Sequence, residues 1–131
     1  MVQRVRVRVP KARQEIYEIR IGAGALAHLG VVARRTLPPH ARRLCLVSNR
    51  KVFDLYGERA VNTLRAEGFT VAHWLMNDGE RYKTAATLTR LLAFLSESGL
   101  EGSDAVVALG GGVVGDLAGF AAAVYLRGIA F

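Results

Sequence analysis

This sequence has few residues that can form a covalent cross-link, few prolines and no long apolar run. Its 131 residues include one cysteine, Cys45, and three prolines. A single cysteine excludes a disulfide framework and indicates a reducing compartment, by default the cytoplasm. No apolar run approaches the roughly 18 residues that a bilayer span needs, so no membrane partner is expected. Because 51% of the residues are hydrophobic, we expect one folded domain over 1–131 rather than a disordered chain.

Acidic residues are also scarce in the first part of the chain. Residues 1–50 carry eleven Lys and Arg against two Glu, whereas residues 51–131 carry seven basic and nine acidic residues. A basic half can indicate a nucleic-acid partner. However, Arg4, Arg6 and Arg8 alternate with valine, as on the solvated face of a strand. Since no aromatic residue lies between them to stack on bases, we predict no nucleic-acid partner and keep a basic nucleic-acid-binding domain as an alternative.

Two hydrophobic rhythms divide the chain. Residues 2–9 and 16–21 alternate apolar and polar side chains, which predicts a half-buried antiparallel hairpin with a turn over 10–14. Its second strand would place Tyr17 and Ile19 on one face. Continuous apolar runs then alternate with amphipathic stretches, a pattern typical of buried parallel strands between helices. The expected strands are 44–47, 69–76, 105–109 and 129–131, and the expected helices are 25–35, 52–67, 84–98 and 113–126.

This order of elements predicts the fold class. Strands that alternate with helices form a parallel sheet with helices on its faces. We therefore predict an α/β fold: a parallel, Rossmann-like nucleotide-binding sheet flanked by helices and preceded by an N-terminal antiparallel β-hairpin. Because the last residues form an apolar strand with no polar tail, we also expect the chain to be truncated before the end of this domain. In the helix over 52–67, the apolar residues form one stripe that is expected to face the core: Val52, Leu55, Tyr56, Ala60, Val61 and Leu64.

The stretch ALGGGVVGDLAGF, residues 108–120, is rich in glycine where a strand passes into a helix. Ligands of parallel α/β sheets bind at this carboxyl edge. Glycines without a Cβ, followed by the unpaired N–H groups of a helix N-terminus, can bind a phosphate. No acidic residue follows Asp116 and no Gly-Lys-Ser/Thr is present, so this is neither an ordinary dinucleotide fingerprint nor a P-loop. A glycine turn that only permits tight helix–strand packing remains the alternative.

A second polar stretch, NDGERYKT over 77–84, follows the preceding strand and so lies at the same edge. Glu80 and Lys83 are three residues apart and can share one side of a helical turn. They can serve either as a carboxylate for ribose hydroxyls with an ammonium beside it, or as a surface ion pair. Asp116 has the same two interpretations, since a carboxylate there can bind a ribose hydroxyl or complement the helix dipole.

Taken together, GGGVVGDLAGFAAAVYLRGIAF and NDGERYKT resemble the 3-dehydroquinate synthases, a family of sugar-phosphate cyclases. The resemblance covers the whole chain but only the N-terminal, nucleotide-binding part of the family. It implies a lyase of the shikimate pathway that uses NAD and a divalent metal, zinc or cobalt. Such an enzyme converts 3-deoxy-D-arabino-heptulosonate 7-phosphate to 3-dehydroquinate and phosphate. It also implies a small sugar-phosphate substrate and a homodimer.

By position, the resemblance implies roles for particular residues. Glu80 and Asp116 would hold ribose hydroxyls, the backbone over Gly111–Val113 would hold the pyrophosphate, and Arg127 would contact the substrate, either within one protomer or across a dimer interface. Asn49 stands where the family commonly has aspartate, so its contact with the adenosine ribose would carry no charge. The implied NAD-contacting residues are Asn49, Asp78, Gly79, Glu80, Arg81, Tyr82, Lys83, Gly111, Gly112, Val113, Val114, Gly115 and Asp116.

The resemblance also implies which parts of the catalytic machinery lie outside this sequence. The family's C-terminal helical domain, which supplies a glutamate and two histidines to the metal, has no counterpart here. His28, His40 and His73 lack metal-ligand spacing, so we expect no metal site and no catalytic residue in this chain, and no activity from it alone. Other sugar-phosphate cyclases, of the 2-deoxy-scyllo-inosose or valiolone type, and iron-type alcohol dehydrogenases remain alternatives.

Overall fold

The computed structural model describes residues 2–9 and 15–131 and confirms the α/β class. The turn expected over 10–14 lies outside the described residues. In the part of the chain that the structure describes, no helix is both long and apolar enough to cross a membrane. The elements, in chain order, are β1 (Gln3–Val9), β2 (Glu15–Ile21), the 3₁₀ turn η1 (Ala25–His28), α1 (Leu29–Thr36), β3 (Arg43–Asn49), α2 (Arg50–Ala66), β4 (Thr70–Met76), the 3₁₀ turn η2 (Glu80–Tyr82), α3 (Ala85–Glu97), β5 (Ala105–Leu109), α4 (Gly112–Val124) and the 3₁₀ turn η3 (Tyr125–Arg127).

The central sheet is parallel, with the strand order β4-β3-β5. Residues 44–47 in β3 are fully buried, as their continuous apolar run predicts. Beyond β5, Ala130 forms an isolated parallel bridge with Ala105, and the amide of Val106 donates to the carbonyl of Ala130 at 3.0 Å. The strand expected over 129–131 is therefore reduced to a single bridge at the outer side of β5.

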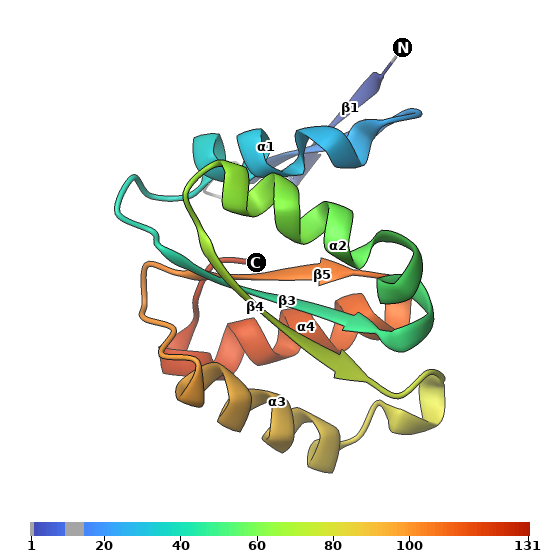
Figure 1. The fold of residues 1–131 in the computed structure, drawn as a ribbon, viewed down its shortest axis with the longest axis vertical. Helices are drawn as coiled ribbons and strands as arrows, with labels where there is room; N and C mark the ends of the chain where they lie inside the picture. Colours follow the sequence, from blue (N-terminus) through green and yellow to red (C-terminus); the bar gives the residue numbers. More distant parts are fainter. Residues whose placement is uncertain (1, 10–14) are drawn as a thin grey trace.

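Helices cover both faces of the sheet (Figure 1). Helices α1 and α2 lie on one face, and α3 and α4 lie on the other. Alternate β3 residues supply the two cores, because successive strand side chains point to opposite faces. Leu44 and Leu46 join the core under α2, whereas Cys45 and Val47 join the core under α3 and α4. Burial raises the pKa of the Cys45 thiol to about 12, so Cys45 is a packing residue.

The expected core face of α2 is partly wrong. Leu55 and Tyr56 are 67% and 50% exposed, whereas Ala60, Val61 and Leu64 are buried as expected. The helix begins at Arg50, two residues before the expected start, and the buried Gly57 lies on its inner face. The packing of α2 against β3 and α1 decides which face of the helix is buried. The apolar stripe in the sequence of α2 does not determine this face by itself.

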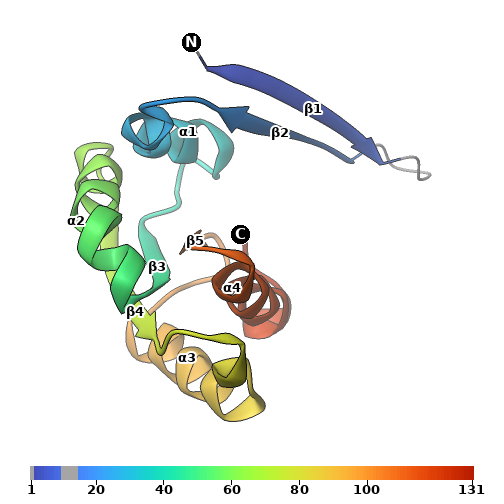
Figure 2. The same cartoon turned by 90° about the vertical axis from the view of Figure 1, so that its right-hand side faces the viewer.

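The β1–β2 hairpin forms with the predicted antiparallel pairing but not with the predicted burial. It extends away from the body of the molecule (Figure 2). Val5, Tyr17, Ile19 and Ile21 are 41–54% exposed, so the half-buried face was wrong for the described residues. On the opposite face, Glu18 pairs with Arg20 at 3.2 Å. These exposures show that no described element covers the apolar face of the hairpin fully.

Close contact between α1 and α2 depends on a glycine. A Cβ on Gly30 would overlap the backbone carbonyl of Thr63 in α2. We expect Gly30→Ala to lower the free energy of unfolding by about 1–3 kcal/mol, because neither backbone can move without disturbing its layer. Gly115→Ala is the contrast, since nothing lies within 4 Å of a Cβ there. It should raise stability slightly through helix propensity, and urea unfolding of the two variants should show opposite signs.

Candidate functional site

One strand end and two loops meet at the carboxyl edge of the parallel sheet. They are the end of β3 at Asn49, which leads directly into α2, the loop that follows β4 from Asn77 and the loop that follows β5 from Gly110. The hydroxyl of Ser48 donates to the carbonyl of Leu109 at 2.6 Å, which joins the ends of β3 and β5. In an open α/β sheet this edge is where ligands bind, so the structure brings the two sequence motifs to one place.

Asn49 connects the end of β3 with the loop after β4. Its Oδ1 accepts a hydrogen bond from the amide of Val52 at 2.9 Å and so caps the N-terminus of α2. Its Nδ2 donates to Oδ1 of Asp78 at 3.4 Å. Asparagine can form both bonds because it carries an acceptor and a donor, which an aspartate at this position could not do. The residue therefore has a structural function that its sequence position did not reveal.

The glycine turn has two different physical functions. A Cβ on Gly110 would lie 2.8 Å from Cγ2 of the buried Val114, so Gly110 permits tight packing. Gly111 and Gly112 have nothing within 4 Å of a Cβ position, and the same holds for Gly115. These three glycines leave open space beside the backbone. Tight packing therefore accounts for Gly110, whereas the open space at the other three glycines leaves room for a phosphate, which stays a prediction.

The N-terminus of α4 is suited to an anion. Asn49 and Thr84 cap α2 and α3 with side-chain oxygens, whereas Gly111 provides no side-chain cap for α4. The first turn of α4 also carries no acidic residue. The amides of residues 112–114 therefore retain donor capacity, and the helix dipole favours negative charge there. Val113 is half-buried and Val114 is buried, so these two contribute backbone groups rather than side chains to this edge.

Lys83 joins the loop after β4 to helix α4. Its Nζ lies 2.5 Å from Oε1 of Glu80 and 3.1 Å from Oδ2 of Asp116. These two hydrogen bonds, the one to Glu80 first, raise the pKa of Lys83 above its ordinary value and keep the ammonium charged. The pairing of Glu80 and Lys83 was predicted from their spacing, but the contact with Asp116 was missed. Residues 33 positions apart carry no local sequence signal for such a contact.

The loop after β4 is shaped by Gly79, whose φ of 115° is accessible mainly to glycine. The guanidinium of Arg81 lies over the Tyr82 ring, 4.9 Å from its centroid. A pocket of about 330 Å³ adjoins Lys83 and Asp116. Leu88, Leu117 and Phe120 form its apolar wall. The site thus combines charged groups, open backbone and an apolar surface.

Arg127 lies away from these loops. Helix α4 starts at the carboxyl edge and runs for 13 residues, a length of about 20 Å. The chain turns sharply after it, with φ of 48° at Leu126 and 66° at Arg127, so the helix ends two residues earlier than expected. Arg127 therefore stands at the opposite edge of the sheet and does not contact the glycine turn of its own chain.

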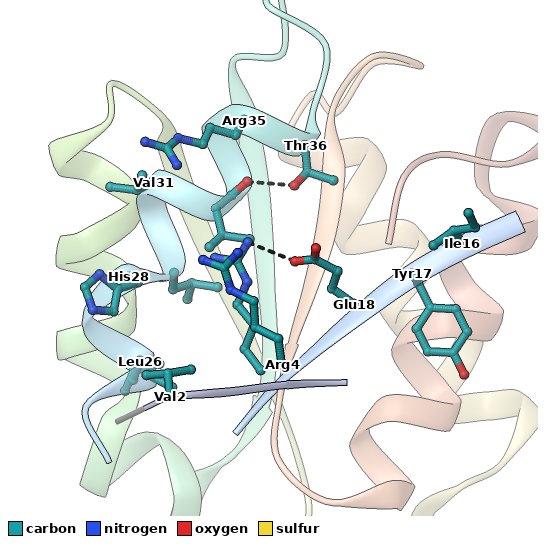
Figure 3. A pocket seen from close by; sticks show the side chains of 14 residues that line it. Val2, Arg4, Ile16, Tyr17, Glu18, Leu26, His28, Val31, Arg35 and Thr36 are labelled. Carbon is teal, nitrogen blue, oxygen red and sulfur yellow. Dashed lines mark hydrogen bonds and ion pairs between the residues drawn. The ribbon is translucent and has the colours of Figure 1, made fainter. Parts of the chain in front are cut away.

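The histidines are scattered, and the described residues contain no group of three His, Cys, Asp or Glu side chains close enough to hold a metal ion. His73 is exposed on the edge strand β4 and stacks on Phe53, with ring centroids 4.5 Å apart. His28 lies in a second hollow between the hairpin and α1 (Figure 3). Its volume is about 940 Å³, and Arg4, Glu18 and Arg35 are among the side chains that line it. The glycine turn is far from this hollow in sequence and lies on other elements.

Comparison with known proteins assigns the chain to a family. Residues 73–131, which include the loops after β4 and β5, match the family described as 3-dehydroquinate synthase N-terminal. The chain is 50% identical over 115 residues to the 3-dehydroquinate synthase of Pelotomaculum thermopropionicum. This chain belongs to the 3-dehydroquinate synthase family. The alignment covers 88% of the chain but 30% of that relative.

Other family members give the same result. The 3-dehydroquinate synthase of Nostoc punctiforme is 42% identical over 130 residues, which is 98% of this chain and 34% of the relative. The chain thus spans about a third of the length of the curated 3-dehydroquinate synthases that it matches. Because the alignments start in the hairpin region and run through the glycine turn, the family assignment covers nearly all described elements.

Solved structures of sugar-phosphate cyclases have the same fold. A 2-deoxy-scyllo-inosose synthase complexed with carbaglucose-6-phosphate, NAD+ and Co2+ matches with a TM-score of 0.78 and 25% identity, over 95% of this chain and 33% of that one. A 2-epi-5-epi-valiolone synthase from Streptomyces hygroscopicus with NAD+ and Zn2+ bound matches with a TM-score of 0.71 and 26% identity, over 94% of this chain and 33% of that one. These two classes were the nearest alternatives from sequence. The identities to 3-dehydroquinate synthases are higher, which supports the main assignment.

Proposed function

We propose that this chain is the NAD-binding portion of a 3-dehydroquinate synthase. Its whole enzyme would convert 3-deoxy-D-arabino-heptulosonate 7-phosphate to 3-dehydroquinate and phosphate, as a lyase of the shikimate pathway. The single observation that carries the proposal is the glycine turn, because Gly111, Gly112 and Gly115 leave open space beside an uncapped helix N-terminus. That cradle fits a pyrophosphate. NAD would supply the reversible oxidation and reduction of a substrate hydroxyl.

The chain's own residues would bind and orient the dinucleotide. The amides over Gly111–Val113 would donate to the pyrophosphate, and the carboxylates of Glu80 and Asp116 would accept from ribose hydroxyls. Lys83 already brings these two carboxylates to one nitrogen. Asn49 would lie beside the adenosine ribose. The remaining proposed contacts are Asp78, Gly79, Arg81, Tyr82, Val114 and Gly115.

We also propose that a divalent metal, zinc or cobalt, is held in the whole enzyme by residues outside this chain. The described residues offer no ligand cluster of their own, whereas the related cyclases are solved with Co2+ or Zn2+. This chain alone would then be inactive. The position of Arg127 at the far edge of the sheet supports a substrate contact made across a homodimer interface rather than within one protomer.

The related cyclases provide a second candidate function. The TM-score of 0.78 to a 2-deoxy-scyllo-inosose synthase shows that the same fold serves another sugar phosphate. Both candidates use the same NAD site, so NAD binding does not separate them. The two candidates are separated by analysing the products that the whole enzyme forms from 3-deoxy-D-arabino-heptulosonate 7-phosphate and from glucose 6-phosphate. Formation of 3-dehydroquinate supports the main proposal, and turnover of glucose 6-phosphate alone contradicts it.

Calorimetric titration of NAD into this chain tests the proposed site. We expect saturable binding that Asp116→Ala weakens by roughly tenfold to a hundredfold, because a hydrogen bond to a charged group is lost. Asp54→Ala is the matched control, since Asp54 is an exposed aspartate on α2. It should leave the affinity unchanged. Equal affinities for the wild type and Asp116→Ala, or no binding by the wild type, would refute the proposed site.

A further inference from the structure

The hollow between the hairpin and α1 carries an excess of positive charge. Its volume of about 940 Å³ is in the range of small-molecule sites. The charged side chains that line it are Arg4, Glu18, Arg20, His28 and Arg35. Figure 3 shows Arg4, Glu18 and Arg35 around this hollow. Three guanidinium groups therefore stand against one carboxylate.

Pairing within the hairpin does not neutralise this charge. Glu18 already pairs with Arg20 at 3.2 Å and lies 3.8 Å from the guanidinium of Arg6. No ion pair links Arg4 or Arg35 to a side chain that the structure describes. In the register of the two strands, Arg4 stands directly opposite Arg20. Like charges in this arrangement destabilise a strand pair, so a bound anion would relieve a repulsion that the hairpin leaves in place.

We propose that this hollow binds a small organic anion, whose oxyanion group is held by Arg4, Arg20 and Arg35. Residues opposite each other on neighbouring strands lie about 5 Å apart at Cβ, so the two guanidinium groups of the hairpin can reach one phosphate or carboxylate. Planar guanidinium groups bind both oxyanions through paired N–H donors. Arg35 supplies the third group from α1. The inference is independent of the proposed NAD site, because the two sites share no residue.

An apolar wall determines what the rest of the ligand must be. Leu26 of η1, and Leu29 and Val32 of α1, line the same hollow and are half-buried. An organic anion with an apolar body would cover these side chains and remove their exposed surface from water, whereas inorganic phosphate would not. The ligand class that fits is therefore a phosphate or carboxylate attached to an apolar group.

Calorimetric titration of phenyl phosphate into this chain tests the proposal. We expect saturable binding, and binding of inorganic phosphate that is at least about tenfold weaker because it lacks the apolar body. Arg4→Gln and Arg35→Gln should each weaken the binding of phenyl phosphate about tenfold, since each removes a hydrogen bond between charged groups. Arg59→Gln is the matched control, because it removes an exposed arginine of α2 outside the hollow and changes the net charge equally. It should leave the affinity unchanged.

Benzoate and urea unfolding complete the test. Benzoate carries the same ring with a carboxylate, so the tighter of the two ligands identifies the preferred oxyanion. Because the anion binds only the folded hairpin, it should raise the urea midpoint of the wild type more than that of Arg4→Gln.

Three results would overturn the inference. The first is the absence of saturable binding of both phenyl phosphate and benzoate at millimolar concentrations. The second is an equal loss of affinity in Arg59→Gln, which would show a general attraction to the basic chain. The third is binding that neither Arg4→Gln nor Arg35→Gln weakens, since the anion would then bind elsewhere, for example at the glycine turn. None of these results changes the NAD titration, so the proposed function is tested separately.

Discussion

Gly111→Asp is expected to abolish NAD binding while making the protein more stable. Gly111 is the N-cap residue of α4, with φ of −82° and ψ of −168°, an extended conformation that any residue adopts. A Cβ there meets nothing within 4 Å. An aspartate can therefore enter without strain, accept a hydrogen bond from an amide of the first turn and complement the helix dipole.

The same aspartate would occupy the proposed pyrophosphate position. It would satisfy the amides that the phosphate needs and place a negative charge beside a negative ligand. We expect NAD affinity to fall more than about 100-fold, while the free energy of unfolding rises by roughly 0.3–1 kcal/mol. Calorimetry and urea unfolding of the same preparation measure the two effects. Their opposite directions distinguish a ligand site from a packing position.

Gly102→Asp is the matched control for charge. Gly102 lies in the loop before β5, at the other edge of the sheet, and nothing lies within 4 Å of a Cβ there. This variant adds the same charge and should leave the NAD affinity unchanged. If Gly111→Asp bound NAD as tightly as the wild type, the glycine turn would not be the pyrophosphate site.

Asp104→Ala is expected to cause the largest loss of stability. Asp104 is 2% exposed and precedes β5. Its Oδ1 accepts hydrogen bonds from the amides of Arg42 and Arg43 at 2.9 Å each, and its Oδ2 accepts one from the amide of Glu101 at 2.8 Å. Removing the carboxylate leaves three donors at the start of the sheet without this acceptor. We expect the free energy of unfolding to fall by about 3–5 kcal/mol.

This loss should depend on pH. Burial acts to raise the pKa of Asp104, but the three backbone hydrogen bonds outweigh it and lower the pKa below its ordinary value of 3.8. A group with a lowered folded pKa stabilises the protein above its unfolded pKa and loses this contribution as the pH falls through the folded value. The difference between wild type and Asp104→Ala should therefore be constant near neutral pH and shrink below about pH 4.

Glu101→Ala is the control for Asp104→Ala. The Glu101 side chain is 76% exposed and lies 3.8 Å from the Arg43 guanidinium. Its removal should change the free energy of unfolding by less than about 1 kcal/mol. Urea unfolding at several pH values tests both variants. If Asp104→Ala lowered the free energy of unfolding as little as Glu101→Ala does, the hydrogen bonds of Asp104 would contribute little to stability.

The sequence predicted the elements well but their outward faces less well. Residues 44–47 are apolar at every position, and β3 is buried on both faces as that pattern requires. The hairpin alternates just as clearly, yet Tyr17 and Ile19 are exposed. Alternation shows that a strand has two different faces, but it does not show whether another layer covers the apolar one. In the same way, the apolar stripe of α2 does not show which of its residues another layer covers. Leu55 and Tyr56 were therefore assigned to the core from sequence although they are exposed.

The candidate site shows the same division. The sequence by itself determined the α/β class, the glycine turn at the carboxyl end of a strand and the pairing of Glu80 with Lys83, because these follow from local periodicity and spacing. Only the tertiary structure decided that Lys83 also contacts Asp116, that Gly110 packs while Gly111 and Gly112 face open space, and that Arg127 stands at the opposite edge. Those features depend on strand order and on the direction of α4. Both are set by the packing of the whole chain rather than by neighbouring residues.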